Sequence, residues 1–324
     1  MKFIGSMRKK QKGDFVKKII LFLFALLIIN CIYAEPISGQ ILVGGLLAHY
    51  ETLQEAVNAI TENGISGDIE ILTNDQMTFN QALHIAGLNQ EGIFNITINA
   101  KPQGLNRSTF VNDSANSWES NYIFKIENSK NIKITGARFE AIASGYGNMI
   151  VMNSGCENIE IDDCVFDGAD VYSSSYHSSI RINGGTTPII RNVIIKNSVF
   201  NDNAYHIDIN SSSYINNINT VSITNNSFSD AYSAISIVRC INATIRGNII
   251  NQSGSGISLT ECTGSLDIGH NRVNAWGAGI SLSSYTSDYY SKNVYNNIIS
   301  VNGYNNYYNS YTSEAVGISL MQAT

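Results

Sequence analysis

Two short apolar patterns alternate along the chain from about residue 124 to residue 320. The first is an apolar–polar–apolar triplet followed, five positions after its last member, by another apolar residue, as in NIKITGARF and NIEIDDCVF. The second is a separate triplet between successive copies of the first, such as IRI, IDI and ISL. Alternation of apolar and polar positions is typical of short β-strands with one buried face. The pattern therefore predicts at least two strands in every repeat unit.

The repeat units are 22 to 38 residues long. The first triplets end at Ile134, Ile161, Ile195, Ile223, Ile245, Ile268 and Val294, with partners at Phe139, Phe166, Phe200, Phe228, Ile250, Val273 and Ile299. The second triplets end at Ile126, Met152, Ile182, Ile209, Ile237, Leu259, Leu282 and Leu320. No stretch between them has the length and spacing of a helix, which disfavours a βαβ or leucine-rich arrangement. The repeats therefore predict an all-β solenoid, a single-stranded parallel β-helix with coils ~4.8 Å apart.

Position-matched polar residues support stacked coils. Three residues beyond four successive first-triplet ends stand Asn226, Asn248, Asn271 and Asn297. Asn tolerates left-handed backbone angles at turns, and stacked amides can hydrogen-bond along the stack. Cys240 and Cys262 also share one coil position. They are expected to form either a small apolar stack or a disulfide between neighbouring coils.

These repeats resemble the right-handed parallel β-helix repeats of pectate-lyase-like proteins and of secreted carbohydrate-binding and sugar-hydrolase domains, over about residues 100–324. The resemblance is specific for the fold but not for the function, because this fold hosts lyases, hydrolases, epimerases, tailspikes and adhesins. Such proteins often begin with a stretch similar to YETLQEA, which opens a short amphipathic helix here. A solenoid needs its apolar end covered, so this helix is predicted to be an N-terminal cap. The chain stops at GISLMQAT in mid-coil, so a truncated product or a fragment is expected.

Residues 1–34 differ from the rest of the chain. Seven Lys and Arg residues precede the apolar run IILFLFALLIINCIYA, which predicts a cleaved signal peptide and a secreted, periplasmic or cell-surface protein without a stable membrane span. A retained membrane anchor is the alternative, but the run is short for a ~30 Å hydrocarbon layer. Lipid attachment at Cys31 fits poorly with Asn30 before it. The predicted organisation is a signal peptide at 1–34, a cap with first coils at 35–100, and β-helix repeats at 101–324.

The net charge of residues 35–324 limits the classes of molecule that the protein is expected to bind. Residues 35–324 keep 20 − 7 = 13 basic and 26 − 1 = 25 acidic residues, a formal charge of −12. Such a surface repels the phosphate backbone, so nucleic-acid binding is not expected. An anionic polysaccharide would also be repelled unless a cation such as Ca²⁺ bridged it.

Four residues are candidates for proton transfer. The middle residues of the second triplets point outward, which places Lys125, Arg181 and Asp208 in one row, and His206 is predicted on the same face. A base, an acid and an imidazole together could abstract a proton next to a uronate carboxylate. The alternative is a surface cross-strand ion pair beside an exposed His. Polygalacturonase-like motifs, zinc spacings and nucleotide-binding loops are missing from the sequence.

The segment IEIDDCVFDGAD suggests a metal site. Asp162, Asp163 and Asp167 surround one turn, and carboxylate oxygens suit Ca²⁺. The resemblance implies that such a cluster could bridge acidic sugars. Turn chemistry is the alternative explanation for these Asp residues.

Tyr residues gather in the loops of the last coil and of an earlier one. The candidates for glycan contact are Tyr172, Tyr176, Tyr285, Tyr289, Tyr290, Tyr304, Tyr307 and Tyr308. Aromatic faces stack on sugar rings while neighbouring Asn amides bond hydroxyls. A loop that packs on the solenoid flank is the alternative. The sequence thus favours a surface protein that binds polysaccharide or another cell-surface partner, with a polysaccharide lyase or hydrolase and a structural stalk as alternatives.

Overall fold

The alternating triplets form strands that stack in register from coil to coil. In the computed structural model, Ile134, Ile161 and Ile195 are aligned on three neighbouring strands, and the same column continues to Val294. Every strand pair in the described part of the chain is parallel, as expected when each coil returns to the same side of the stack. The chain folds as a right-handed parallel β-helix, the hand that parallel crossovers favour.

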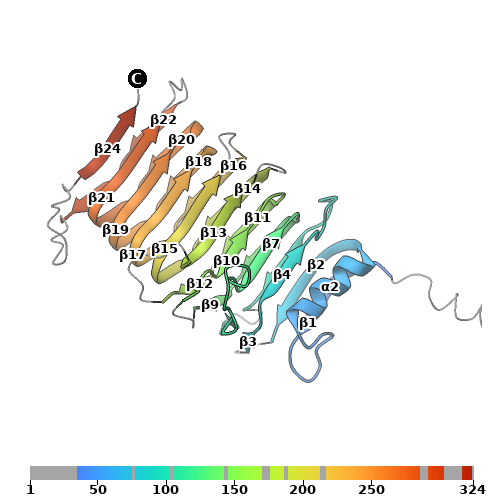
Figure 1. Cartoon of the computed structure of the whole chain (residues 1–324). Coiled ribbons are helices and arrows are strands. Elements are labelled where there is room, and N and C mark those ends of the chain that lie inside the picture. The colour runs from blue at the N-terminus through green and yellow to red at the C-terminus, as the bar shows by residue number, and fades with distance from the viewer. Residues whose placement is uncertain are drawn as a thin grey trace, which may run out of the picture. The chain divides into compact units, whose positions relative to one another are not determined.

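The structure describes residues 35–74, 77–101, 106–141, 145–169, 176–185, 189–211, 217–284, 291–302 and 316–322. The chain divides into Met1–Pro36 and Ile37–Thr324. The predicted signal peptide lies outside the described residues and stays a prediction. Within Ile37–Thr324, the coils stack in one direction from the helix α2 to the strand β24 (Figure 1).

A ten-stranded sheet forms the first face of the solenoid. Its strands are β1 (Ile37–Val43), β2 (Ile65–Thr73), β5 (Ile96–Asn99), β8 (Lys130–Thr135), β11 (Glu157–Asp162), β14 (Ile190–Lys196), β16 (Ile218–Thr224), β18 (Cys240–Arg246), β20 (Thr263–Gly269) and β22 (Lys292–Tyr295). From β8 onward these strands contain the first triplets of the sequence pattern.

A fourteen-stranded sheet bends around the rest of each coil and forms two further faces. The second face consists of β3 (Thr78–Asn80), β6 (Thr109–Val111), β9 (Arg138–Glu140), β12 (Val165–Asp167), β23 (Ile298–Val301) and the first halves of β15 (Val199–Ser211), β17 (Ser227–Val238), β19 (Ile249–Thr260) and β21 (Arg272–Ser284). The third face consists of β4 (Leu83–Ala86), β7 (Phe124–Glu127), β10 (Ile150–Met152), β13 (Ser178–Gly184), β24 (Val316–Gln322) and the second halves of β15 to β21.

Stacked aromatic rings fill part of the core. The ring centroids of Phe139 and Phe166 lie 5.0 Å apart, those of Phe166 and Phe200 4.6 Å, and those of Phe200 and Phe228 4.7 Å. All four rings are fully buried. Near-parallel rings at this spacing follow from one Phe per coil at the same inward position. The predicted partner positions of the first triplets are therefore confirmed as core.

The Asn column forms a buried amide ladder. The Nδ2 atom of Asn226 donates to Oδ1 of Asn248 at 3.1 Å, Asn248 to Asn271 at 3.0 Å, and Asn271 to Asn297 at 3.0 Å. The predicted left-handed backbone is wrong by one position, because the positive φ belongs to the preceding corner residue, such as His270 at 58°. The ladder amides bond inward to backbone while that corner residue makes the turn.

The predicted cap is confirmed. Helix α2 (Leu53–Asn63) buries its apolar side against the first coil, beside β1 and β2 (Figure 1). A capping box starts it, in which Thr52 Oγ1 accepts from the backbone N–H of Glu55 and the Glu55 carboxylate accepts from that of Thr52. Cys240 and Cys262 are both buried and free, so the apolar-stack interpretation is confirmed and the disulfide alternative is wrong.

Candidate functional site

The third face carries an outward row with one residue per strand. From β4 to β24 the row consists of His84, Lys125, Val151, Arg181, Asp208, Ser236, Ser258, Ser281 and Ser319. Alternation points these side chains away from the core because, from His84 to Ser281, their neighbours on either side are buried. Lys125, Arg181 and Asp208 therefore lie in one outward row, where the sequence pattern places them.

Arg181 and Asp208 are neighbours on β13 and β15. The Arg181 Nη1 atom lies 3.7 Å from Asp208 Oδ2, and the two side chains are only 14% and 15% exposed. Arg181 Nε also donates to Asn183 Oδ1 at 3.1 Å, and its guanidinium lies 4.8 Å from the ring centroid of Trp118. Burial raises the pKa of the Asp208 carboxyl above its ordinary value, although the charge of Arg181 opposes this.

His206 does not share this face, and the prediction that it does is wrong. Its side chain is fully buried, with Nε2 2.8 Å from the carbonyl oxygen of Ser229 and its ring centroid 5.8 Å from those of Phe200 and Phe228. Burial lowers the pKa of this imidazole to about 4. The alternation slips at the bend of β15, where His206 and Ile207 are both buried, so counting back two residues from Asp208 gives the wrong side.

Lys125 pairs with Glu127 on the third face and not with Asp208. Its Nζ lies 3.1 Å from Glu127 Oε2, while His84 Nε2 lies 2.7 Å from Glu127 Oε1 and Asn153 Nδ2 donates to Glu127 Oε2 at 3.2 Å. Burial raises the pKa of Glu127, but these hydrogen bonds outweigh it and leave the pKa below its ordinary value. Lys125 is also two strands away from Arg181, roughly 10 Å. The four predicted proton-transfer residues are therefore not brought together.

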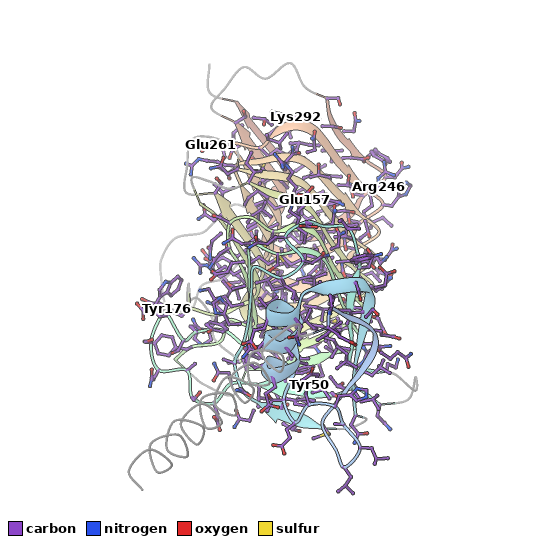
Figure 2. The ribbon with its side chains drawn as sticks, turned by 90° about the vertical axis from the view of Figure 1, so that its right-hand side faces the viewer. Tyr50, Glu157, Tyr176, Arg246, Glu261 and Lys292 are labelled. Atoms are coloured by element: carbon purple, nitrogen blue, oxygen red, sulfur yellow. The ribbon has the colours of Figure 1, made fainter. Side chains whose placement is uncertain are left out.

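Aromatic rings gather beside the Arg181–Asp208 pair. The ring centroids of Trp118 and Tyr176 lie 5.4 Å apart, and those of Tyr146 and Tyr176 5.7 Å apart, in edge-to-face contacts. Trp118 and Tyr176 are 46% and 44% exposed. Figure 2 shows Tyr176 on the flank of the solenoid opposite Arg246.

The rings continue along the stack. Tyr205 and Tyr232, on β15 and β17, have ring centroids 5.8 Å apart. Tyr205 stands three positions before Asp208 on β15 and is aligned with Ser178 on β13, and burial raises the pKa of its hydroxyl. We call Trp118, Tyr146, Tyr176, Tyr205 and Tyr232 the aromatic cluster.

Of the predicted glycan-contacting Tyr residues, the structure describes one, Tyr176, and places it in this cluster. The remainder lie outside the described residues: Tyr172, Tyr285, Tyr289, Tyr290, Tyr304, Tyr307 and Tyr308. Trp118 and Tyr146 were not among the candidates. The available signal for Trp118 was an aromatic residue in the polar segment NDSANSWESNY, outside the repeat pattern.

The three candidate Ca²⁺ ligands point to different parts of the coil. Asp162 faces outward from β11 with Lys133 at 3.0 Å, Asp163 stands at a left-handed corner paired with Arg107, and Asp167 lies on β12 with Arg138 at 2.9 Å. Among the described residues, no group of three or more His, Cys, Asp or Glu side chains is placed to hold a metal ion. These contacts do not favour the predicted Ca²⁺ site, which stays a prediction.

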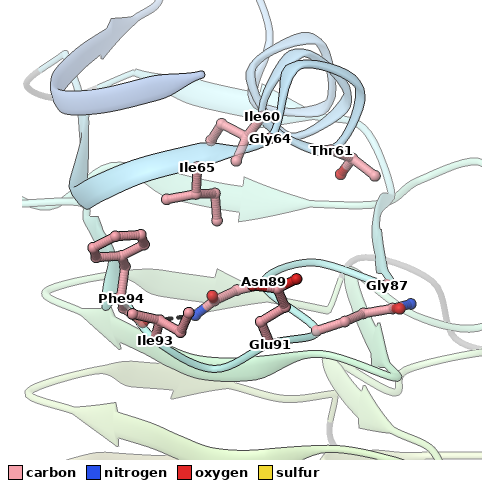
Figure 3. Close-up of a pocket in the computed structure, with 10 residues that line it drawn as sticks. Ile60, Thr61, Gly64, Ile65, Gly87, Asn89, Glu91, Ile93 and Phe94 are labelled. Carbon is pink, nitrogen blue, oxygen red and sulfur yellow. Dashed lines mark hydrogen bonds between the residues drawn. The ribbon is translucent and has the colours of Figure 1, made fainter.

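A hollow of about 390 Å³ lies at the capped end, between the end of α2, the start of β2 and residues 87–94 (Figure 3). Ile60, Ile65, Ile93 and Phe94 contribute apolar side chains, and Glu91 is the one ionisable group in its lining. Asn89 Nδ2 donates to the carbonyl oxygen of Phe94 at 2.6 Å and closes one side. Its polar groups serve the turn, so the third face remains the stronger candidate.

Comparisons with known proteins identify distant structural neighbours. No protein-family model matches the chain, and no curated protein matches it in sequence. The solved structures similar to it include the Streptococcus pneumoniae surface protein and adhesin PfbA, with 17% identity, a TM-score of 0.43, and coverage of 90% of this chain and 83% of that one. Another is the GH136 lacto-N-biosidase from Eubacterium ramulus, with 8% identity, a TM-score of 0.40, and coverage of 80% and 68%. These distant likenesses assign no activity to this chain. In the described residues, no helix has the length and apolar character needed to span a bilayer.

Proposed function

We propose that this protein is an exported carbohydrate-binding protein that holds a glycan on its third face without cleaving it. The observation that carries the proposal is the aromatic cluster beside the Arg181–Asp208 pair. Exposed Trp and Tyr rings present flat apolar faces that match the C–H faces of sugar rings. Two rings of the cluster, those of Trp118 and Tyr176, leave almost half of their surface open to such contacts.

Neutral hydrogen-bonding groups lie on the same face as these rings. Asn183 Nδ2, on β13, donates to Oδ1 of Asn153, directly after β10, at 3.3 Å. Ser236 and Ser258 continue the outward row on β17 and β19. Amides and hydroxyls that project from rigid strands can exchange hydrogen bonds with sugar hydroxyls without reorganising the fold.

Among the described residues, the strands of this face offer no acid–base pair for hydrolysis. The carboxylates in its outward rows are Glu127 and Asp208, which stand three strand spacings apart, roughly 14 Å. Hydrolases that work with two carboxylates place them about 5 to 9.5 Å apart. The buried imidazole of His206 cannot assist. Binding is therefore better supported than turnover.

One observation favours an enzyme as the second candidate. The raised pKa of Asp208 in a site lined by aromatic rings is the kind of perturbation that active sites show. A lyase or hydrolase acting on uronic-acid polymers would then use Asp208 in proton transfer. Export is inferred from the basic and apolar leader at residues 1–34.

The experiment incubates the purified protein, with and without Ca²⁺, with plant, algal and bacterial polysaccharides and measures polymer amount and length by size-exclusion chromatography. The proposal expects one or more polymers to be depleted at unchanged length. Shortened chains that disappear in an Asp208→Asn variant would establish the enzyme instead. Polymers unchanged in amount and length would favour a structural or protein-binding role.

Two variants locate the contact. Trp118→Ala should weaken retention of the bound polymer at least about fivefold, because a stacked ring contributes roughly 1 to 2 kcal/mol. Tyr295→Ala is the matched control, since this ring lies 5.7 Å from the guanidinium of Arg246 on the first face. Equal losses in both variants would argue against the third face as the binding surface.

A further inference from the structure

The charges of the third face are balanced within the face itself. Lys125 and His84 surround Glu127, and Arg181 lies beside Asp208. The outward row beyond Asp208, on β17, β19, β21 and β24, is made of Ser residues. Strands of this face therefore present no unpaired charge that would attract an ionic ligand.

The loop that carries Trp118 adds negative charge to the cluster. Residues 112–122 include Asp113 and Glu119 and contain no basic residue. Asn121 fixes this loop against the cluster, because its Nδ2 donates to the carbonyl oxygen of Tyr176 at 2.8 Å and its Oδ1 accepts from the backbone N–H of Asn148 at 3.0 Å. Together, this loop and the neighbouring Arg181–Asp208 pair hold three acids and one base, a formal charge of 1 − 3 = −2.

Arg181 is poorly placed to offset a ligand carboxylate. Its guanidinium is already covered by Trp118, bonded to Asn183 and paired with Asp208, and its side chain is 14% exposed. A bidentate contact with an incoming carboxylate requires an open guanidinium edge. A carboxylate brought here would also meet Asp208 on the next strand.

We propose that the glycan bound by the aromatic cluster is uncharged, so that neutral sugars are recognised by stacking and by amide and hydroxyl groups while uronic-acid polymers are disfavoured. This inference rests on the proposed glycan-binding function and gives it a substrate class. One ligand carboxylate about 10 Å from a net charge of −2 in water is disfavoured roughly threefold to fourfold at low salt. Several carboxylates along a polymer increase that penalty.

The test uses chemically matched ligands. Polygalacturonate and other uronic-acid polymers are compared with the same polymers after reduction of each carboxylate to a primary alcohol, beside natural neutral glycans, by affinity electrophoresis of the full chain. We expect every retained polymer to be neutral or carboxyl-reduced, with affinity at least about threefold above the carboxylated parent. Affinity for the neutral form should change by less than about twofold between about 20 mM and about 500 mM NaCl, because it contains no charge to be screened.

A variant that removes one negative charge tests whether electrostatic repulsion, separately from contact with the rings, disfavours acidic ligands. Glu119→Gln removes one acid beside the cluster, and binding of a neutral glycan should remain within about twofold of the wild type. Tighter binding of a uronic-acid polymer by Glu119→Gln, with the neutral form unaffected, would support the electrostatic reasoning. Preferred binding of the carboxylated polymers, or affinity that falls steeply with salt, would overturn the neutral-ligand inference while leaving glycan binding in place. Failure to retain any polymer would overturn both.

Discussion

The buried amide ladder makes a quantitative prediction about stability. Asn248 sits in its middle, fully surrounded by protein. Its Oδ1 accepts from the backbone N–H of Asn226 at 3.0 Å and from Asn226 Nδ2 at 3.1 Å. Its Nδ2 donates to the carbonyl oxygen of Ile223 at 2.9 Å and to Asn271 Oδ1 at 3.0 Å. The substitution Asn248→Ala removes all four hydrogen bonds at once.

The expected loss of unfolding free energy follows from the buried groups that Asn248→Ala leaves without a hydrogen-bond partner. The backbone N–H of Asn226 and one N–H of its side-chain amide lose their acceptor in a region without access to water, and each unsatisfied buried group costs about 1 to 3 kcal/mol. We expect Asn248→Ala to lower the free energy of unfolding by about 3 to 5 kcal/mol. The comparison is Asn192→Gly, at a half-buried position outside the ladder with a positive φ of 52°, where a single amide bond to Asn158 is lost. Glycine suits that backbone, so the expected loss is below about 1 kcal/mol.

Urea unfolding followed by circular dichroism measures the difference, and hydrogen exchange locates it. The amide of Asn226 should exchange much faster in Asn248→Ala, while amides several coils away keep their protection, because a solenoid couples mainly neighbouring coils. Destabilisation by Asn248→Ala no larger than that by Asn192→Gly would refute the argument. It would mean that the amide column is incidental to the stack.

Three further predictions follow from the core. Phe166→Ala should lower the free energy of unfolding by about 3 to 5 kcal/mol, and Phe166→Leu by at most about 1.5 kcal/mol, in the same urea assay; equal losses would show that the stacked rings are loosely packed. Because the folded pKa of His206 is about 4, lower than in the unfolded chain, stability should be complete above about pH 6.5 and decline by about 3 kcal/mol as pH falls toward 4. His206→Leu should lack this part of the decline in pH-dependent unfolding, whereas the corner variant His270→Asn should retain it. The buried Cys164 thiol, whose pKa burial raises to about 12, should resist Ellman's reagent at pH 8 until urea unfolds the chain, and rapid native modification would contradict its burial.

The fold could be predicted from the sequence because each coil repeats the same local rule. An apolar residue such as Ile161 lies between Ile134 and Ile195 in both the sequence repeat and the strand register. Alternation within a triplet correctly placed Arg181 and Asp208 outward. The rule failed at His206, where β15 bends and two consecutive residues turn inward. Inward and outward side chains alternate along a straight strand, but this alternation is interrupted where the strand bends.

The candidate site was harder to predict because its contacts are not periodic. Trp118 reaches Arg181 from a loop 63 positions earlier, and no repeat relates the two residues. Asp162 and Asp163 were predicted to lie together because they are adjacent in sequence. Asp162 instead faces outward from a strand, whereas Asp163 stands at a corner of the coil. In a solenoid, two side chains are predicted to lie together when they share a coil position on neighbouring coils. Closeness along the chain alone does not predict it.

The residues of the outward rows bear on the proposal that the aromatic cluster binds a ligand. Inward positions must repeat, because each Phe or Ile rests on the same residue of the next coil. Outward positions do not have to match the next coil in this way. In the outward row they are Ser on β17, β19, β21 and β24. On β13 and β15 the row changes to Arg181 and Asp208, at the coils where the Trp118 loop folds over the face. A partly buried ion pair costs desolvation that Ser would avoid, so stacking alone does not account for its presence. The proposed ligand recognition would account for it, because the pair lies against the Trp118 ring while leaving the face without net charge from its strands.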